Sequence, residues 1–227
     1  MNVLLLVAMF LVAQPQAAQV VRVPATVHRS LFDPKEPQPY IPKMKDRENA
    51  VTQARFEARC AFTHEVVSRT QGEVTIRLIN TRITLSLDSV IYLPTDVRPP
   101  LRVHEEGHRV INERIYENEA ESIAREVVSH VLEKSWTAAS AERAVAAAMD
   151  EFVAQYRLQL ARRATAVNER FDQITRHAAN VDVTVVDAID QAFASTMTTA
   201  PTTTTTIPTT TQAATARTPP PAPRAGP

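Results

Sequence analysis

The stretch Ile83-Thr-Leu-Ser-Leu-Asp-Ser-Val-Ile-Tyr-Leu-Pro-Thr-Asp-Val-Arg-Pro-Pro-Leu-Arg-Val-His-Glu-Glu-Gly-His108 changes its hydrophobic period partway along. From Ile83 to Leu87, apolar and polar residues alternate, which is the pattern of a β-strand with one buried face. Three prolines, at positions 94, 99 and 100, then interrupt this pattern. Beyond them Leu101, His104 and His108 recur at spacings of three and four residues, as in an α-helix. The sequence therefore predicts a sheet before the prolines and a helix after them.

The segments before this stretch extend the predicted sheet. Apolar and polar residues also alternate from Phe56 to Phe62 and from Val74 to Leu78. Such alternation is typical of antiparallel strands with one solvated face. Val20 to Val27 is a further candidate strand.

The segments after it extend the predicted helices. Between Leu101 and Pro201 there is no proline and the only glycine is Gly107, so the helices are expected to be long and unbroken. A second helix is predicted to follow Trp136, with Thr137 as its N-cap. Strands followed by helices indicate an α+β fold with a small antiparallel sheet followed by long helices.

Composition excludes several classes of protein. The 227 residues hold 25 Lys and Arg against 25 Asp and Glu, and a net charge of zero argues against nucleic-acid binding. Three glycines are too few and too scattered for a glycine-rich phosphate loop. The single cysteine, Cys60, excludes a disulfide scaffold and a multi-cysteine metal cage.

The two ends are predicted to lie outside the folded domain. Residues 1–18 resemble a signal peptide, because an apolar run too short to span a bilayer, which needs about 20 residues, precedes small residues. The chain is therefore expected to be secreted or periplasmic, with no membrane span after cleavage. The remaining predicted segments are an N-terminal strand and Pro-rich connector (19–53), the folded domain (54–180), a short extension (181–195) and a disordered Thr/Pro-rich tail (196–227).

One motif carries the chemistry: His104-Glu105-Glu106-Gly107-His108, of the form His-Glu-x-x-His. Residues four apart share one face of a helix, so the two imidazoles can bind one Zn²⁺. Glu105, at the adjacent position, can take a proton from a metal-bound water.

A catalytic zinc site needs a third protein ligand. On an unbroken helix Glu121 lies about 20 Å from the motif, at about 1.5 Å per residue, so it can serve only if the helix breaks near residues 116–118. In a plain helical hairpin, the residues level with His108 are 163–167. The chain must therefore bend near residues 168–172 to bring His177 to the metal, or Glu169 is the ligand.

The segment Phe171-Asp172-Gln173-Ile174-Thr175-Arg176-His177 adds a resemblance. Together with the first motif, it resembles a bacterial family of predicted secreted zinc-dependent proteases, whose second motif is Tyr-Asp-x-x-Thr-x-His-Gly. The resemblance covers residues 54–178. It implies a zincin-like metallopeptidase with His177 as third ligand and Asp172 as a partner behind the ligands. Phe171 and Ala178 depart from the family's Tyr and Gly, so a hydroxyl able to stabilise an oxyanion is missing unless Tyr156 replaces it.

The leading hypothesis is therefore a zinc metallopeptidase, whose activity is weak if that hydroxyl is required. Zn²⁺ is bound by His104, His108 and His177, Glu105 is the base, and the substrate is a peptide or protein. Residues 83–87 or 90–93 are expected to pair with an extended substrate by strand addition. The alternatives are a non-catalytic zinc-binding envelope or scaffold protein with a Thr/Pro-rich tether, and a hydrolase of amides in cell-wall peptides. Glu105 favours catalysis, because a purely structural zinc site needs no base.

Overall fold

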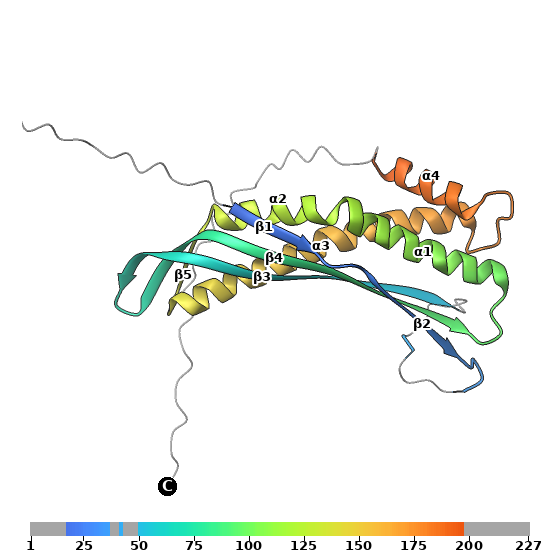
Figure 1. The fold of residues 1–227 in the computed structure, drawn as a ribbon, viewed down its shortest axis with the longest axis horizontal. Helices are drawn as coiled ribbons and strands as arrows, with labels where there is room; N and C mark the ends of the chain where they lie inside the picture. The colour runs from blue at the N-terminus through green and yellow to red at the C-terminus, as the bar shows by residue number, and fades with distance from the viewer. Residues whose placement is uncertain (1–16, 37–40, 43–49, 198–227) are drawn as a thin grey trace, which may run out of the picture.

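The computed structural model describes residues 17–36, 41–42 and 50–197. They form one five-stranded sheet with four helices on one of its faces, which confirms the predicted α+β class (Figure 1). In chain order the elements are β1 (Ala17–Arg22), β2 (Thr26–Phe32), β3 (Val51–Thr70), β4 (Glu73–Pro94), α1 (Pro99–Asn118), α2 (Ala120–Leu132), β5 (Ser135–Ala138), α3 (Ala141–Thr175) and α4 (Val185–Met197).

Strand β4 is the centre of the sheet. Along one edge it pairs antiparallel with β3. Along the other it pairs in turn with β5, β1 and β2, of which β1 and β2 run parallel to it. The sheet is therefore mixed, and the prediction of an antiparallel sheet is wrong for these two pairings. Residues 83–85 and 90–92 are therefore paired on both sides, and the prediction that residues 83–87 or 90–93 add a substrate strand is wrong. The outer edge of β3 is unpaired among the described strands, as are the outer edges of β1, β2 and β5.

A β-bulge explains why one long strand looks like two in the sequence. Thr63 pairs with Asn80, whereas His64 pairs with Leu78, so Ile79 has no partner in the ladder. The extra residue shifts the alternation by one position. Leu78 and Ile83 consequently both face the helices and are fully buried, whereas Ile79 is 44% exposed.

The prolines end the sheet and begin the helices as expected. Pro94 is the last residue of β4, and Pro99 and Pro100 occupy the first positions of α1, where a missing N–H costs nothing. The expected unbroken helix is interrupted at Glu119, between α1 and α2. The interruption is small, because Glu119 still donates its N–H to the Ile115 carbonyl and accepts from the Ile123 N–H.

The second helix begins later than predicted. Trp136 and Thr137 belong to β5, which pairs with β4, so Thr137 is not an N-cap. Ser140 is the N-cap of α3, and its side chain accepts a hydrogen bond from the Arg143 N–H at 3.3 Å. The β propensity of the Trp-Thr pair and its place beside an open edge of β4 outweigh the capping preference of threonine.

One core joins the sheet to all four helices. Alternate side chains of β4, including Leu85 and Leu87, pack against Ile111 and Ile115 of α1 and against Phe152 of α3, and all are fully buried. Strand β1 joins the sheet and α4 contributes Ala188, Ile189, Ala192 and Phe193 to this core. The folded unit thus includes residues on both sides of the predicted 54–180 domain.

Several expectations lie outside the described residues. These are most of the signal peptide (1–16), parts of the Pro-rich connector (37–40 and 43–49) and the tail from residue 198 on. Within the described part of the chain, no helix is long and apolar enough to cross a membrane.

The burial of Cys60 in β3 gives a first prediction. Burial, with a smaller contribution from the charge of Asp150, raises the pKa of the Cys60 thiol to about 11. Because the thiolate is the reactive form, Cys60 should react with a thiol reagent at pH 8 far more slowly in the folded protein than in urea. Thr63→Cys in a Cys60→Ala background places a thiol at an exposed position of the same strand and should react at once. Fast labelling of native Cys60 would contradict the burial.

Candidate metal centre

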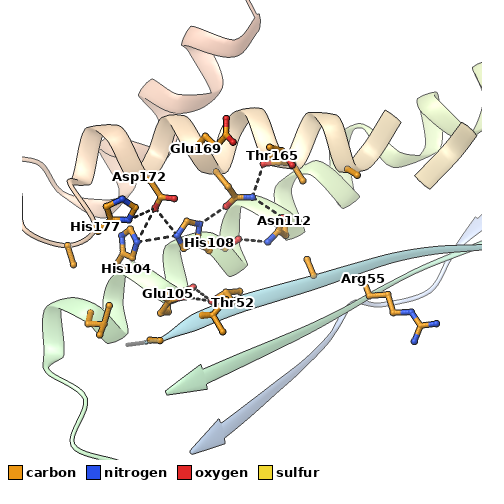
Figure 2. Close-up of a pocket in the computed structure, with 18 of the residues that line it drawn as sticks. Thr52, Arg55, His104, Glu105, His108, Asn112, Thr165, Glu169, Asp172 and His177 are labelled. Carbon is orange, nitrogen blue, oxygen red and sulfur yellow. Dashed lines mark hydrogen bonds and ion pairs between the residues drawn. The ribbon is translucent and has the colours of Figure 1, made fainter. Parts of the chain in front are cut away.

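Three donor atoms from two helices converge beside the sheet (Figure 2). His104 and His108 of α1 approach each other with their Nε2 atoms 3.1 Å apart. Asp172 of α3 places its Oδ1 atom 3.2 Å from the His104 Nε2 and 3.0 Å from the His108 Nε2. Among the described residues, these three form the one group of side chains that could hold a metal ion.

Hydrogen bonds on the far side of each ring fix which nitrogen carries the proton. The Thr175 hydroxyl donates to the Phe171 carbonyl at 2.8 Å, so it accepts from the Nδ1–H of His104 at 3.3 Å. The Nδ1 of His108 lies 2.6 Å from the Oδ1 of Asn168, which can only accept. Both Nε2 atoms therefore face the group as lone pairs.

Asn168 is itself held in the required orientation. Its Nδ2 donates to the Ala164 carbonyl at 2.8 Å and to the Oδ1 of Asn112 at 3.2 Å. Asn112 in turn donates its Nδ2 to the His108 carbonyl at 2.8 Å. Because the amide nitrogen is occupied by acceptors, the oxygen of Asn168 must face His108, and the tautomer of His108 follows.

With both imidazoles neutral and in these tautomers, the group brings together three hydrogen-bond acceptors. In the part of the chain that the structure describes, the buried Oδ1 of Asp172 has no other polar partner within hydrogen-bond distance than the two imidazole Nε2 atoms. Burial lowers the pKa of His108, but its contacts with Asp172 and Asn168 and the charge of Glu105 raise it overall. Burial raises the pKa of Asp172, but the contacts with the two histidines lower it by more, so the pKa lies below its usual range. A cation at this point satisfies all three acceptors.

The spacing of the donors suits a small tetrahedral ion. Zinc binds imidazole nitrogen and carboxylate oxygen at about 2.0 to 2.2 Å, and two ligands of a tetrahedral ion are then about 3.3 to 3.5 Å apart. The three sides of the observed triangle measure 3.1, 3.2 and 3.0 Å. The residues present therefore fit a metal ion with small adjustments of the side chains.

The Phe171 ring packs against both histidines. It stacks on His104 with centroids 5.0 Å apart and meets His108 edge-on at 5.1 Å. The ring is fully buried, and a Cβ built at Gly107 would lie 2.5 Å from its Cζ atom. The glycine of the motif therefore allows α3 to approach α1 closely. A hydroxyl on Cζ would meet α1 and not the cavity.

The register of the two helices differs from the hairpin estimate. Because β5 occupies the turn and α3 begins at Ala141, the residue level with His108 is Asn168, and Asp172 lies one turn further along beside His104. No bend occurs at residues 168–172, since α3 runs unbroken to Thr175. The chain turns afterwards, through three successive residues with positive φ: Arg176 at 49°, His177 at 52° and Ala178 at 69°.

His177 lies beside the group and is not one of its three members. Its side chain is 70% exposed, its Nδ1 is 3.6 Å from the Oδ1 of Asp172, and its ring centroid is 6.2 Å from that of His104. In the structure Asp172 joins the two histidines of the group, and His177 lies next to Asp172. The sequence signal for Asp172 is its place in the second motif, where it precedes Thr175 by three residues on one face of a helix.

The two glutamates considered as ligands are not in the group. Glu121 pairs with Arg125 at 2.8 Å and lies 3.8 Å from Arg22, beyond the interruption at Glu119. Glu169 lines the cavity described below but faces a different side of α3 from Asp172 (Figure 2).

The histidines and Glu105 open into one cavity of about 1330 Å³. It is bounded by α1, by α3 and by residues 50–52 and 54–56 at the start of β3. Glu105 is buried, and its Oε2 accepts a hydrogen bond from the Thr52 hydroxyl at 2.7 Å. Tyr156 cannot supply the missing hydroxyl, because it is fully buried in the core and does not line the cavity.

Comparison of the chain with models of protein families, with curated proteins and with solved structures gives no match. The chemistry of the centre therefore rests on its own atoms: three converging acceptors, their fixed tautomers and a buried carboxylate in the same cavity.

Two variants separate Asp172 from His177 as the third ligand. Asp172→Asn keeps the shape of the side chain but removes the charge, and it should weaken zinc binding by about 100-fold or more. His177→Ala should change the affinity by less than about threefold, because His177 is outside the group. Competition with a chelating dye measures both affinities. The opposite order would assign the ligand role to His177.

Gly107→Ala tests the close approach of the two helices. In an exposed helix this change stabilises by about 1 kcal/mol. Here the new methyl group meets the buried Phe171 ring, so we expect a loss of about 1 to 3 kcal/mol in urea denaturation. Adding Phe171→Leu should restore part of that loss. A Gly107→Ala protein more stable than wild type would refute the packing argument.

Proposed function

We propose that this chain is an exported, secreted or periplasmic, zinc-dependent peptidase, related to the protease family that its two motifs resemble. One observation carries the proposal: three cation-binding acceptors with fixed tautomers stand in an open cavity that also contains a buried carboxylate, Glu105. A structural metal site would be closed by a fourth protein ligand and would have no use for a base.

Zinc is the ion that best suits the donor set. Two imidazoles and a carboxylate are a common ligand set for catalytic zinc, which keeps one position open for water or substrate. When bound, zinc acts as a Lewis acid that acidifies water and polarises a carbonyl group. His104, His108 and Asp172 would hold it, and the tightly packed partners Thr175 and Asn168 keep the two rings oriented.

Glu105 is the proton carrier in this proposal. The Thr52 hydroxyl donates to its Oε2 atom, and the Oε1 atom is left to accept a proton from the attacking water. The carboxylic acid then returns that proton to the leaving amine, so that one group serves as base and acid in turn. Glu105 is itself buried and lines the same cavity as the two histidines.

The outer edge of β3 is the proposed docking strand for the substrate. Residues 50–52 and 54–56 line the cavity, so this edge runs past Glu105 and the two histidines. An edge strand offers unpaired N–H and C=O groups to an extended chain. We call His104, His108 and Asp172 the metal group. A peptide bound along β3 would pass this group in an extended form, which is the conformation that peptidases cleave.

The non-catalytic alternative is favoured by one feature, the absence of a tyrosine hydroxyl at position 171. Phe171 is fully buried under His104, and the described part of the cavity contains no tyrosine. A protein that binds zinc and peptide without cleaving would need no such donor. Measurement of zinc content and of hydrolysis on the same preparations distinguishes the two functions.

Glu105→Gln is the decisive variant. It should retain stoichiometric zinc and lose peptide hydrolysis by about 100-fold or more, because the amide cannot carry a proton. Glu106→Gln is the matched control: the same change one residue along, at a side chain that pairs with Arg29 and Arg109 outside the cavity. It should retain most of the activity.

Casein, a peptide library and cell-wall peptides serve as substrates, with zinc measured by elemental analysis. Zinc bound without hydrolysis of any substrate by the wild-type protein would favour the non-catalytic alternative. Absence of stoichiometric zinc would contradict both functions.

A further inference from the structure

The cavity extends well beyond the metal group. Its two long walls are α3 and β3, and Arg157 and Phe56 line its far end. Arg157 precedes Asn168 by eleven residues, which is about 16 Å along a helix. Glu57 follows Thr52 by five residues, which is about 17 Å along a strand. The helix and the strand thus give similar distances, and the far end lies about 16 Å from the histidines.

At the far end of the cavity, two arginines share one carboxylate, that of Glu57. The Nη2 of Arg157 lies 3.6 Å from the Oε1 of Glu57, so this pair connects α3 to β3. The same oxygen is 2.5 Å from the Nη2 of Arg55. One carboxylate thus faces two guanidinium groups, and the nearer is Arg55. Among the described residues Glu57 is the ion-pair partner of Arg157, whose side chain is 53% exposed.

The wall between the two ends is made of small side chains. Ala161, Ala164 and Thr165 of α3 face Ala54 of β3 across the cavity. Side chains of this size leave room for a polypeptide backbone between the helix and the strand. The free edge of β3 supplies hydrogen-bonding groups over the same length.

We propose that this cavity binds an extended peptide that carries an acidic side chain at the Arg157 end, about five residues from the metal group. A carboxylate of the peptide displaces Glu57 as the partner of Arg157, and the backbone of the peptide pairs with β3. The placement relative to a cleaved bond rests on the proposed peptidase function, whereas the binding itself requires no hydrolysis. Arg157 is a specificity-determining residue in this proposal.

Peptide binding to the full-length Glu105→Gln protein, loaded with zinc, tests the proposal. The probes are two fluorescent decapeptides of alanine and threonine. They differ at one residue, which is Glu in one peptide and Gln in the other and lies five positions from the residue expected at the metal group. Fluorescence anisotropy should show that the Glu peptide binds roughly threefold to tenfold more tightly, as expected for a partly solvated charge pair. An added Arg157→Gln change should reduce this ratio to about one.

A second variant separates recognition from a structural role of the ion pair. Glu57→Gln removes the competing carboxylate and should strengthen binding of the Glu peptide. If the Arg157–Glu57 pair only holds α3 to β3, both variants should weaken binding of both peptides alike. Arg162→Gln, at an exposed position of the same helix outside the cavity, should leave the ratio unchanged. Thermal unfolding confirms that each variant is folded.

The outcomes distinguish this proposal from the peptidase function. Selective binding without hydrolysis by the wild-type protein supports the acidic subsite and contradicts the peptidase. Hydrolysis with no preference between the two peptides supports the peptidase function and contradicts the acidic subsite. A preference that persists in Arg157→Gln, or a loss of binding in Glu57→Gln, would overturn the subsite.

Discussion

The contact between the Phe171 ring and Gly107 sets the distance and the register at which α3 crosses α1. With a side chain at position 107 the two helices would have to separate, since its first carbon would lie 2.5 Å from the ring. At the observed distance Asp172 stands beside both imidazoles, Thr175 reaches the Nδ1 of His104, and Asn168 reaches that of His108. The contacts that cross between α1 and α3 at this site depend on this one packed pair.

The elements with a strong period were predictable, and those decided by tertiary contacts were not. The alternation of β3 and β4 and the two prolines at the start of α1 each carry a local signal. The bulge at Ile79 is not visible as such, because a shift in phase also fits two separate strands. Strand β5 was not predicted, because its four residues form a strand only by pairing with β4.

The same division holds for the metal group. His104 and His108 follow from helical spacing alone, and both lie in the group. Asp172 could not be identified as its third member by counting, because the register of α3 depends on where the turn around β5 ends. A hairpin without β5 puts residues 163–167 level with His108, whereas Asn168 occupies that place. The resemblance pointed to the segment that contains Asp172, and it implied His177 as the ligand.

The composition of the donor set has a consequence for folding. Two donors belong to α1 and one to α3, and His108 and Asp172 are separated by 64 residues of chain. An ion bound there acts as a cross-link between the helices that closes this loop, and its binding free energy adds to the free energy of folding. The concentration of such an ion in the surroundings would then set how firmly the last turns of α3 are held. The resistance of the metal-bound form to proteolysis would then rise with metal concentration, with no change in the polypeptide.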